Sequence, residues 1–259
     1  MKATATVKSV ELGEYRVNYA SEGSGPTMIM LHGSDKREDW RVWEPLLELS
    51  REYSLVIPDL VGFGGSTIPI ETPDYKAQAR VLHEMTERLG IQKAILVGTS
   101  WGGQVALEVA MNWPQSVEDL ILISSTYDKS QLLRLSGMRR PTMIIWAEDD
   151  RVAPLKAGYL LRDSIGTSRL EVLGAVAKNP HYDFTIAHKL ERYKKEAILS
   201  LIRDFLASPS QKIAEPPRWS QSSKGGHGKM RRRKAALSRL PRSHRYSFLL
   251  VLLLYRVAV

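Results

Sequence analysis

An apolar strand, a tight turn and a helix follow one another over residues 94–110, and this succession restricts the fold more than any other stretch of the chain. The first four residues, Ala-Ile-Leu-Val, predict a buried strand, and the last seven predict a helix. Ser100 falls at the junction. Gly98 and Gly102, two residues before and after it, remove the side chains that would collide in a sharp turn. The Ser100 hydroxyl is therefore expected at a helix N-terminus, where unpaired N–H groups and a partial positive charge favour an oxyanion.

Short apolar runs alternate with helical patterns along most of the chain. Besides an antiparallel pair at the N-terminal end, the runs predict buried strands over residues 27–31, 54–58, 120–123, 142–146 and 168–173. Helical spacing of apolar residues is found over residues 43–49, 76–89 and 197–206. The alternation is typical of an α/β fold: a doubly wound, mostly parallel sheet of the eight-stranded type with helices on both faces.

Charge divides the chain into two parts. The formal net charge is +9, yet residues 207–259 hold twelve Lys or Arg and one acidic residue, whereas residues 1–206 hold 25 basic and 27 acidic groups. We expect one α/β domain over residues 1–206 and a basic, largely disordered tail over residues 207–259, which is rich in Pro, Ser and Gly. The basicity therefore predicts nothing about the function of residues 1–206.

The tail offers two candidate contacts. The basic run at residues 229–234 is of the kind that contacts acidic surfaces such as phosphates or anionic lipids, or a nuclear import receptor, and it indicates no specific nucleic acid. The apolar stretch at residues 246–259 is shorter than the ~20 residues needed to span a bilayer. In place of spanning the membrane, it could lie on a membrane surface.

Cysteine is absent, so disulfides and thiolate metal sites are excluded. The first residues lack the apolar core of a signal peptide. A cytoplasmic location is expected, with nuclear or membrane-peripheral association through the tail as the alternative.

Three segments resemble the α/β-hydrolase family. Residues Gly98–Gly102 resemble its G-x-S-x-G nucleophile elbow, residues His32–Ser34 its His-Gly-x segment, and residues Asp59–Ser66 its Asp-x-x-Gly-x-Gly-x-Ser loop. Each follows a predicted strand, and the resemblance covers about residues 10–206.

The resemblance assigns an oxyanion hole to two backbone groups. These are the N–H groups of Ser34 and of Trp101, the residue after the nucleophile. His32 in this pattern is a structural histidine that hydrogen-bonds the surrounding loops. No metal or cofactor is implied.

The acid of a catalytic triad is expected after the strand at residues 142–146. The family's acid lies four residues before a proline, which selects Asp150 because of Pro154. Asp149 is the reserve candidate. A buried carboxylate here holds a histidine in one tautomer and stabilises its imidazolium.

Two histidines compete for the role of base. His181 is favoured because it lies in the loop directly after the strand at residues 168–173, although no glycine precedes it as the family pattern would require. His188 is the reserve candidate: its spacing to the closing helix at residues 197–206 is the more typical, but it lies in a stretch that resembles the start of a solvated helix. The order Ser100, Asp150, His181 matches the nucleophile, acid, base order of the family.

These residues predict a serine hydrolase that cleaves carboxylic esters or thioesters through an acyl-enzyme, with Ser100 as nucleophile, His181 as base and Asp150 as its orienting acid. An aspartate in place of Ser100 would have indicated a dehalogenase or an epoxide hydrolase. Two alternatives stay open: a non-catalytic binding protein with the same fold, and a perhydrolase-like use of the same triad.

The predicted pocket is open because the expected lid is minimal. Many α/β-hydrolases insert a cap domain where this chain has only residues 124–140, in which residues 131–135 are long enough for one or two helical turns. A small-molecule or protein-linked acyl substrate is therefore expected in a shallow crevice.

Overall fold

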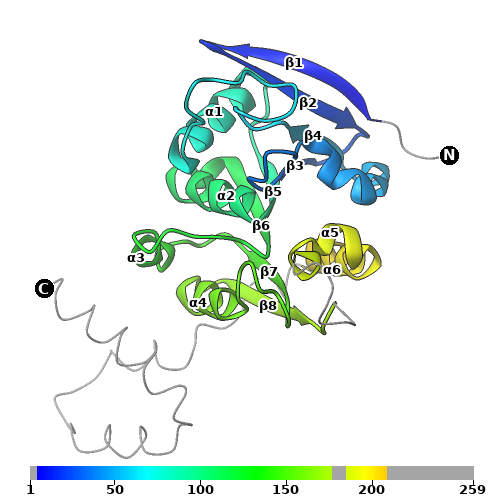
Figure 1. Cartoon of the computed structure of the whole chain (residues 1–259), viewed down its shortest axis with the longest axis vertical. Coiled ribbons are helices and arrows are strands. Elements are labelled where there is room, and N and C mark those ends of the chain that lie inside the picture. The colour runs from blue at the N-terminus through cyan, green and yellow to red at the C-terminus, as the bar shows by residue number, and fades with distance from the viewer. Residues whose placement is uncertain (1–4, 177–184, 209–259) are drawn as a thin grey trace, which may run out of the picture. The chain divides into compact units, whose positions relative to one another are not determined.

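The computed structural model of the chain describes residues 5–176 and 185–208, which form an eight-stranded sheet with helices on both faces (Figure 1). This confirms the predicted fold class. The strands are β1 (Thr6–Leu12), β2 (Tyr15–Glu22), β3 (Thr27–Leu31), β4 (Ser54–Pro58), β5 (Ala94–Thr99), β6 (Val117–Ile123), β7 (Thr142–Ala147) and β8 (Ser168–Leu173).

The strand order indicates where on the sheet a functional site is expected. The order is β1-β2-β4-β3-β5-β6-β7-β8, with antiparallel pairing from β1 to β2 and from β2 to β4 and parallel pairing elsewhere. The chain passes from β3 outward to β4 and then returns to the other side of β3 as β5. Such a reversal opens a crevice at the carboxyl ends of the strands. At that end Leu31 of β3 is paired with Gly98 of β5, so the segments after these strands begin side by side.

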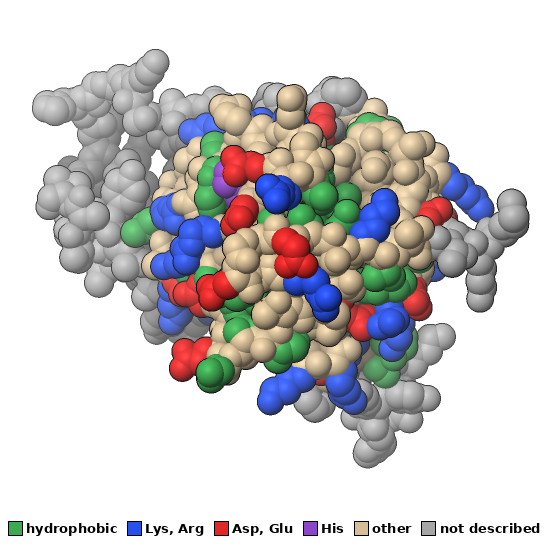
Figure 2. All heavy atoms as spheres, turned by 90° about the horizontal axis from the view of Figure 1, so that it is seen from above, with side chains coloured by type: hydrophobic (Ala, Val, Ile, Leu, Met, Phe, Trp, Pro, Cys, Tyr) green, Lys and Arg blue, Asp and Glu red, His purple; other side chains and the backbone are tan. Residues whose placement is uncertain are grey.

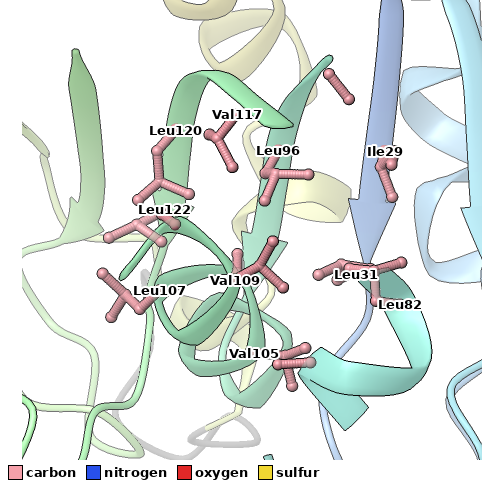
Figure 3. Close-up of a cluster of buried hydrophobic side chains, with 14 of the residues drawn as sticks. Ile29, Leu31, Leu82, Leu96, Val105, Leu107, Val109, Val117, Leu120 and Leu122 are labelled. Atoms are coloured by element: carbon pink, nitrogen blue, oxygen red, sulfur yellow. The ribbon is translucent and has the colours of Figure 1, made fainter. Parts of the chain in front are cut away.

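Two apolar cores cover the two faces of the sheet. The helices are η1 (Trp40–Arg51, a 3₁₀ helix), α1 (Tyr75–Arg88), α2 (Trp101–Asn112), η2 (Pro114–Ser116), α3 (Leu132–Leu135), α4 (Lys156–Ser164), η3 (Ile186–His188), α5 (Leu190–Tyr193) and α6 (Lys195–Ala207). One core joins β-strand side chains such as Ile29 and Leu96 to Leu82 of α1 and Val105 of α2 (Figure 3). The other core lies under η1, α5 and α6. Strands β5 and β7 are buried along their whole length, as their apolar sequences require.

Helix η1 begins three residues earlier than its predicted start. The side chain of Asp39 caps it by accepting the N–H of Arg41 at 2.8 Å. Asp59, which follows β4, accepts the N–H of Trp40 at 2.8 Å. This second bond joins residues 19 positions apart, so the local sequence pattern does not contain it. Pro45 lies inside the helix and cannot donate an α-helical hydrogen bond, which is consistent with the 3₁₀ form.

Charged side chains of both signs are mixed on the surface of the described residues. On the face shown in Figure 2, Lys and Arg side chains lie among Asp and Glu side chains. This agrees with the near balance of charge over residues 1–206. Within the described part of the chain, no helix is both long enough and apolar enough to cross a membrane. The predicted tail lies, from residue 209 onward, outside the described residues.

The connection from β6 to β7 is short and is fastened to α2 by a buried acid. Its helix α3 comprises residues 132–135, within the segment where one or two turns were predicted. Glu108 of α2 is 4% exposed and accepts hydrogen bonds from Gln131 Nε2 (2.8 Å), Asn112 Nδ2 (2.8 Å) and Arg134 (3.2 Å). Burial alone would raise the pKa of Glu108, but these donors outweigh burial and lower it below its ordinary value. Four polar groups thus hold the connection against the domain.

Replacing Glu108 by glutamine should lower the free energy of unfolding by about 1–3 kcal/mol at pH 7. The amide has one acceptor oxygen in place of two, and its NH₂ group would face the N–H donors that now bind the carboxylate. Because the pKa of Glu108 is lower in the folded state, its stabilisation is complete above the unfolded pKa near 4.5 and is lost as the pH falls through the folded value. Urea unfolding between pH 7 and pH 3 should therefore show the two proteins converging below about pH 4.5. The matched control, Glu118→Gln on the exposed side of β6, should change little; a gap that stays constant with pH would contradict the prediction.

Candidate active site

Ser100 occupies a strained turn between β5 and α2. Its φ of 51° and ψ of −121° lie in a region that a non-glycine residue adopts only when its surroundings enforce it. The enforcement comes from β6 and the segment after it: the N–H of Ser100 donates to Ile123 O at 3.0 Å, and its carbonyl accepts from Thr126 N–H at 3.0 Å. Such stored strain is common at reactive positions.

The two glycines of the predicted turn are required by close contacts with backbone atoms. A Cβ on Gly98 would lie 2.5 Å from the carbonyl oxygen of Gly102. A Cβ on Gly102 would overlap the carbonyl oxygens of Leu31 and His32, at the end of β3. The glycines therefore allow α2 to begin directly against β3 and β5. The helix start, where N–H groups lack partners within the helix, is thereby brought beside Ser100.

The loop after β3 lies directly against the serine. A Cβ on Gly33 would be only 3.3 Å from Cβ of Ser100, so the Gly33–Ser34 peptide passes next to the nucleophile position. Ser34 is exposed, and Trp101 is half-buried as the first residue of α2. The two residues predicted to supply the oxyanion hole are thus at the ends of neighbouring strands β3 and β5.

His32 is held as a structural residue, as its pattern predicts. Its Nδ1 donates to Gly33 O at 2.8 Å, and its Nε2 accepts the N–H of Leu60 at 3.0 Å. The ring is completely buried, and burial lowers its pKa. Phe63 lies between this ring and Trp101, with ring centroids 5.2 Å and 5.9 Å away. Since both ring nitrogens are engaged, His32 fixes the loops and leaves the chemistry to other groups.

Asp150 follows β7 and has a fully buried side chain. Its Oδ1 accepts the N–H groups of Val152 and Ala153, both at 2.9 Å. Its Oδ2 lies 2.9 Å from Nδ1 of His188. The reserve acid, Asp149, turns elsewhere and accepts the N–H of Val176 at 2.9 Å. Within the described residues, Asp150 is the one of these two acids that contacts a histidine.

His188 is the histidine that the fold brings to Asp150. It ends η3, is 9% exposed and presents Nδ1 to the carboxylate. Because a carboxylate only accepts, Nδ1 carries a proton, and in the neutral ring Nε2 has a free lone pair. Among the described residues, Nε2 is buried and has no hydrogen-bond partner. The favoured sequence candidate, His181, lies outside the described residues. The spacing to the closing helix is the sequence signal that indicated His188.

Two further acids near His188 were not singled out from the sequence. Glu38 lies in the loop after β3, and Glu191 is 3% exposed in α5. Burial, together with the charge of Glu38, raises the pKa of Glu191 to about 8. Burial also raises the pKa of Glu38, while the charges of Lys189 and His188 oppose that shift. No local motif marks either residue, because their burial depends on how the loop and α5 pack.

The described residues offer no metal-binding cluster in this region. Within residues 5–176 and 185–208, His, Asp and Glu side chains form no group of three or more with metal-binding geometry. A hollow of about 600 Å³ lies at the opposite end of the strands, where Thr27 and Ser54 begin β3 and β4. Lys93 and Tyr19 also line it. It is distant from the reactive side chains in the fold and includes none of the predicted site residues.

Sequence comparisons match this chain to known proteins over the N-terminal half of its described residues. A family model for the alpha/beta hydrolase fold matches residues 26–137. A fluoroacetate dehalogenase from Burkholderia sp. is 34% identical over 120 residues, which span 44% of this chain and 39% of the dehalogenase. A soluble epoxide hydrolase from Corynebacterium sp. is 30% identical over 124 residues, spanning 48% of this chain and 43% of that protein. The chain thus spans about two fifths of the length of these curated relatives.

Solved structures are similar over more of the chain. A predicted CIB-like hydrolase from Thermoplasma acidophilum has a TM-score of 0.69 at 20% identity and covers 79% of this chain and 98% of its own. The 2-hydroxy-6-oxo-6-phenylhexa-2,4-dienoate hydrolase from Rhodococcus sp. strain RHA1 has a TM-score of 0.69 at 16% identity and covers 80% of this chain and 100% of its own. At sequence identities of 16% and 20%, this similarity shows a shared fold and nothing about activity.

Proposed function

Because this chain belongs to the α/β-hydrolase fold superfamily, we propose that it is a serine hydrolase in which Ser100, His188 and Asp150 form the catalytic triad. The observation that carries the proposal is the 2.9 Å contact between Asp150 Oδ2 and His188 Nδ1, at the same edge of the sheet as the strained turn of Ser100. His188 takes the place of His181, the candidate favoured from the sequence.

The proposed reaction follows from the tautomer of His188. Asp150 holds the proton on Nδ1, so Nε2 is free to accept the proton of the Ser100 hydroxyl as Oγ attacks an acyl carbonyl. The N–H groups of Ser34 and Trp101 would donate to the oxyanion that forms. His188 then protonates the leaving group, and water releases the acid from the acyl-enzyme.

Esters and thioesters fit a serine nucleophile better than the substrates named in the curated relatives. If a serine oxygen displaced a halide or opened an epoxide, the product would be an ether, which has no carbonyl for water to attack. An acyl group on Ser100 is an ester that His188 and water can hydrolyse. We therefore propose that this chain transfers an acyl group to water. The dehalogenation and epoxide opening named for the relatives are not proposed for it.

The short connection between β6 and β7 supports an acyl group that is small or carried on another protein. Residues 124–141 contain a single helix of four residues, α3, held by Glu108. No cap domain is present at this point of the described chain. We therefore expect a substrate to approach Ser100 without passing a cap domain at this connection.

A fluorophosphonate probe tests the proposal, since it reacts only with an activated serine. The protein should be labelled at Ser100, and Ser100→Ala should abolish labelling and lower kcat for p-nitrophenyl acetate by about 10⁴-fold or more. Ser136→Ala, a change at an exposed serine of the β6–β7 connection, is the matched control and should label normally. A well-folded protein that neither labels nor cleaves the ester would instead support a non-catalytic binding function.

A further inference from the structure

Three buried polar atoms near the proposed triad have no partner. They are Oε2 of Glu38, Nε2 of His188 and Oε2 of Glu191, all within the described residues. Native proteins leave few such atoms unpaired, because each costs free energy when it is removed from water without a hydrogen bond. Glu38 interacts electrostatically with both His188 and Glu191, which points to a small polar group that these unpaired atoms share during function.

Glu38 is placed beside the nucleophile by the loop after β3. The position of a Cβ on Gly33 is 2.5 Å from Glu38 Oε2 and 3.3 Å from Ser100 Cβ. The carboxyl and the serine thus lie against the same glycine. A turn in which the N–H of Glu38 donates to Asp35 O at 2.8 Å holds the loop in this course.

Glu38 is also close to His188 and Glu191. Burial raises the pKa of Glu38, a shift that the charge of His188 opposes, and burial together with the charge of Glu38 raises the pKa of Glu191 to about 8. Glu191 is therefore mainly protonated at neutral pH, whereas Glu38 Oε2 is a buried acceptor without a hydrogen-bond partner. The charged groups that act on these acids are Lys189, Arg192 and Asp35.

The second half of the proposed reaction requires such an acceptor. Water attacks the acyl carbonyl while one of its hydrogens passes to Nε2 of His188, and its other hydrogen has to be held in a fixed direction. We propose that Glu38 Oε2 accepts that second hydrogen and so positions the attacking water; this inference rests on the serine hydrolase function proposed above.

The step balances without a further reactant. The water oxygen forms a bond to the acyl carbon, and its proton moves to His188 Nε2. The bond from the carbon to Ser100 Oγ then breaks as Nε2 returns the proton to Oγ. The carboxylic acid leaves, and Glu38 remains unchanged as a positioning residue.

Methanol provides the test, because it attacks through the same base but has no second hydrogen for Glu38 to hold. With p-nitrophenyl butyrate in a fixed water–methanol mixture, the ratio of methyl ester to acid reports on the acyl-enzyme alone, whichever step limits the overall rate. Glu38→Leu should raise this ratio about tenfold, which is the size expected for the loss of one hydrogen bond. Glu38→Gln keeps an acceptor oxygen and should restore most of the water reaction.

Two comparisons separate this role from a structural one. Glu44→Leu, on the exposed side of η1, should leave the ratio unchanged. The melting temperature of Glu38→Leu should equal or exceed that of the wild type, because a half-buried acid whose Oε2 has no hydrogen-bond partner is replaced by an apolar side chain. An unchanged ratio in a Glu38→Leu protein that still labels with fluorophosphonate overturns the inference and leaves the serine hydrolase intact. A wild-type protein that does not label overturns both.

Discussion

Replacing His188 by alanine is expected to lower kcat/KM for p-nitrophenyl acetate by about 10⁴-fold, the upper range for loss of a general base. The expectation follows from the bond between His188 Nδ1 and Asp150 Oδ2, which fixes the tautomer that a serine nucleophile requires. Steady-state kinetics measure the loss. Circular dichroism spectra and melting curves should confirm that the variant is folded, because the ring is buried.

His181→Ala is the decisive partner of this variant. The sequence favoured His181 as the base, so the two substitutions distinguish the two assignments directly. If His188 is the base, His181→Ala should keep kcat/KM within a few-fold of the wild type. The reverse result, in which His181→Ala is inactive and His188→Ala retains activity, would refute the triad proposed here.

Gly102→Ala is expected to destabilise the fold by about 3 kcal/mol or more, at the upper end of the cost of overpacking. The new Cβ would overlap the backbone oxygens of Leu31 and His32. Backbone atoms at the end of a central strand cannot turn aside as a flexible side chain would. Relief would require α2 to move away from β3, which would also displace Ser100. Urea unfolding measures the loss of stability.

Gly166→Ala is the matched control for this substitution. A Cβ at Gly166 would meet no atom within 4 Å, and the backbone there does not have a positive φ. Its free energy of unfolding should differ from the wild type by a few tenths of a kcal/mol, with a gain from the smaller entropy of the unfolded chain. Equal stability of the two alanine variants would show that the close contact at Gly102 is relieved without cost.

The sheet could be predicted from the sequence because central parallel strands are recognisable from their own residues. The central strands Thr27–Leu31 and Ser54–Pro58 have the predicted bounds, and so does the partly exposed edge strand Ser168–Leu173. Central strands are buried on both faces and therefore carry continuous apolar runs. The start of η1 was missed because its first N–H group is held by Asp59, from a distant segment.

The candidate site was predictable to the extent that its parts are local. The elbow of Ser100 depends on glycines two residues away, and the choice of Asp150 depended on a proline four residues later. The partner of Asp150 lies 38 residues onward. Its identity depends on the path of the chain between β8 and α6, which residue spacing only suggests. Glu38 and Glu191 were missed for a related reason: nothing in a polar stretch shows which acids will be buried.

The four-residue helix between β6 and β7 has a kinetic consequence. Enzymes that fold a separate body over the substrate often have a turnover limited by its opening and closing. At this connection the chain has no such body to move. For the serine hydrolase proposed above, this connection would add no opening or closing step to substrate entry, and discrimination between substrates would owe nothing to its movement.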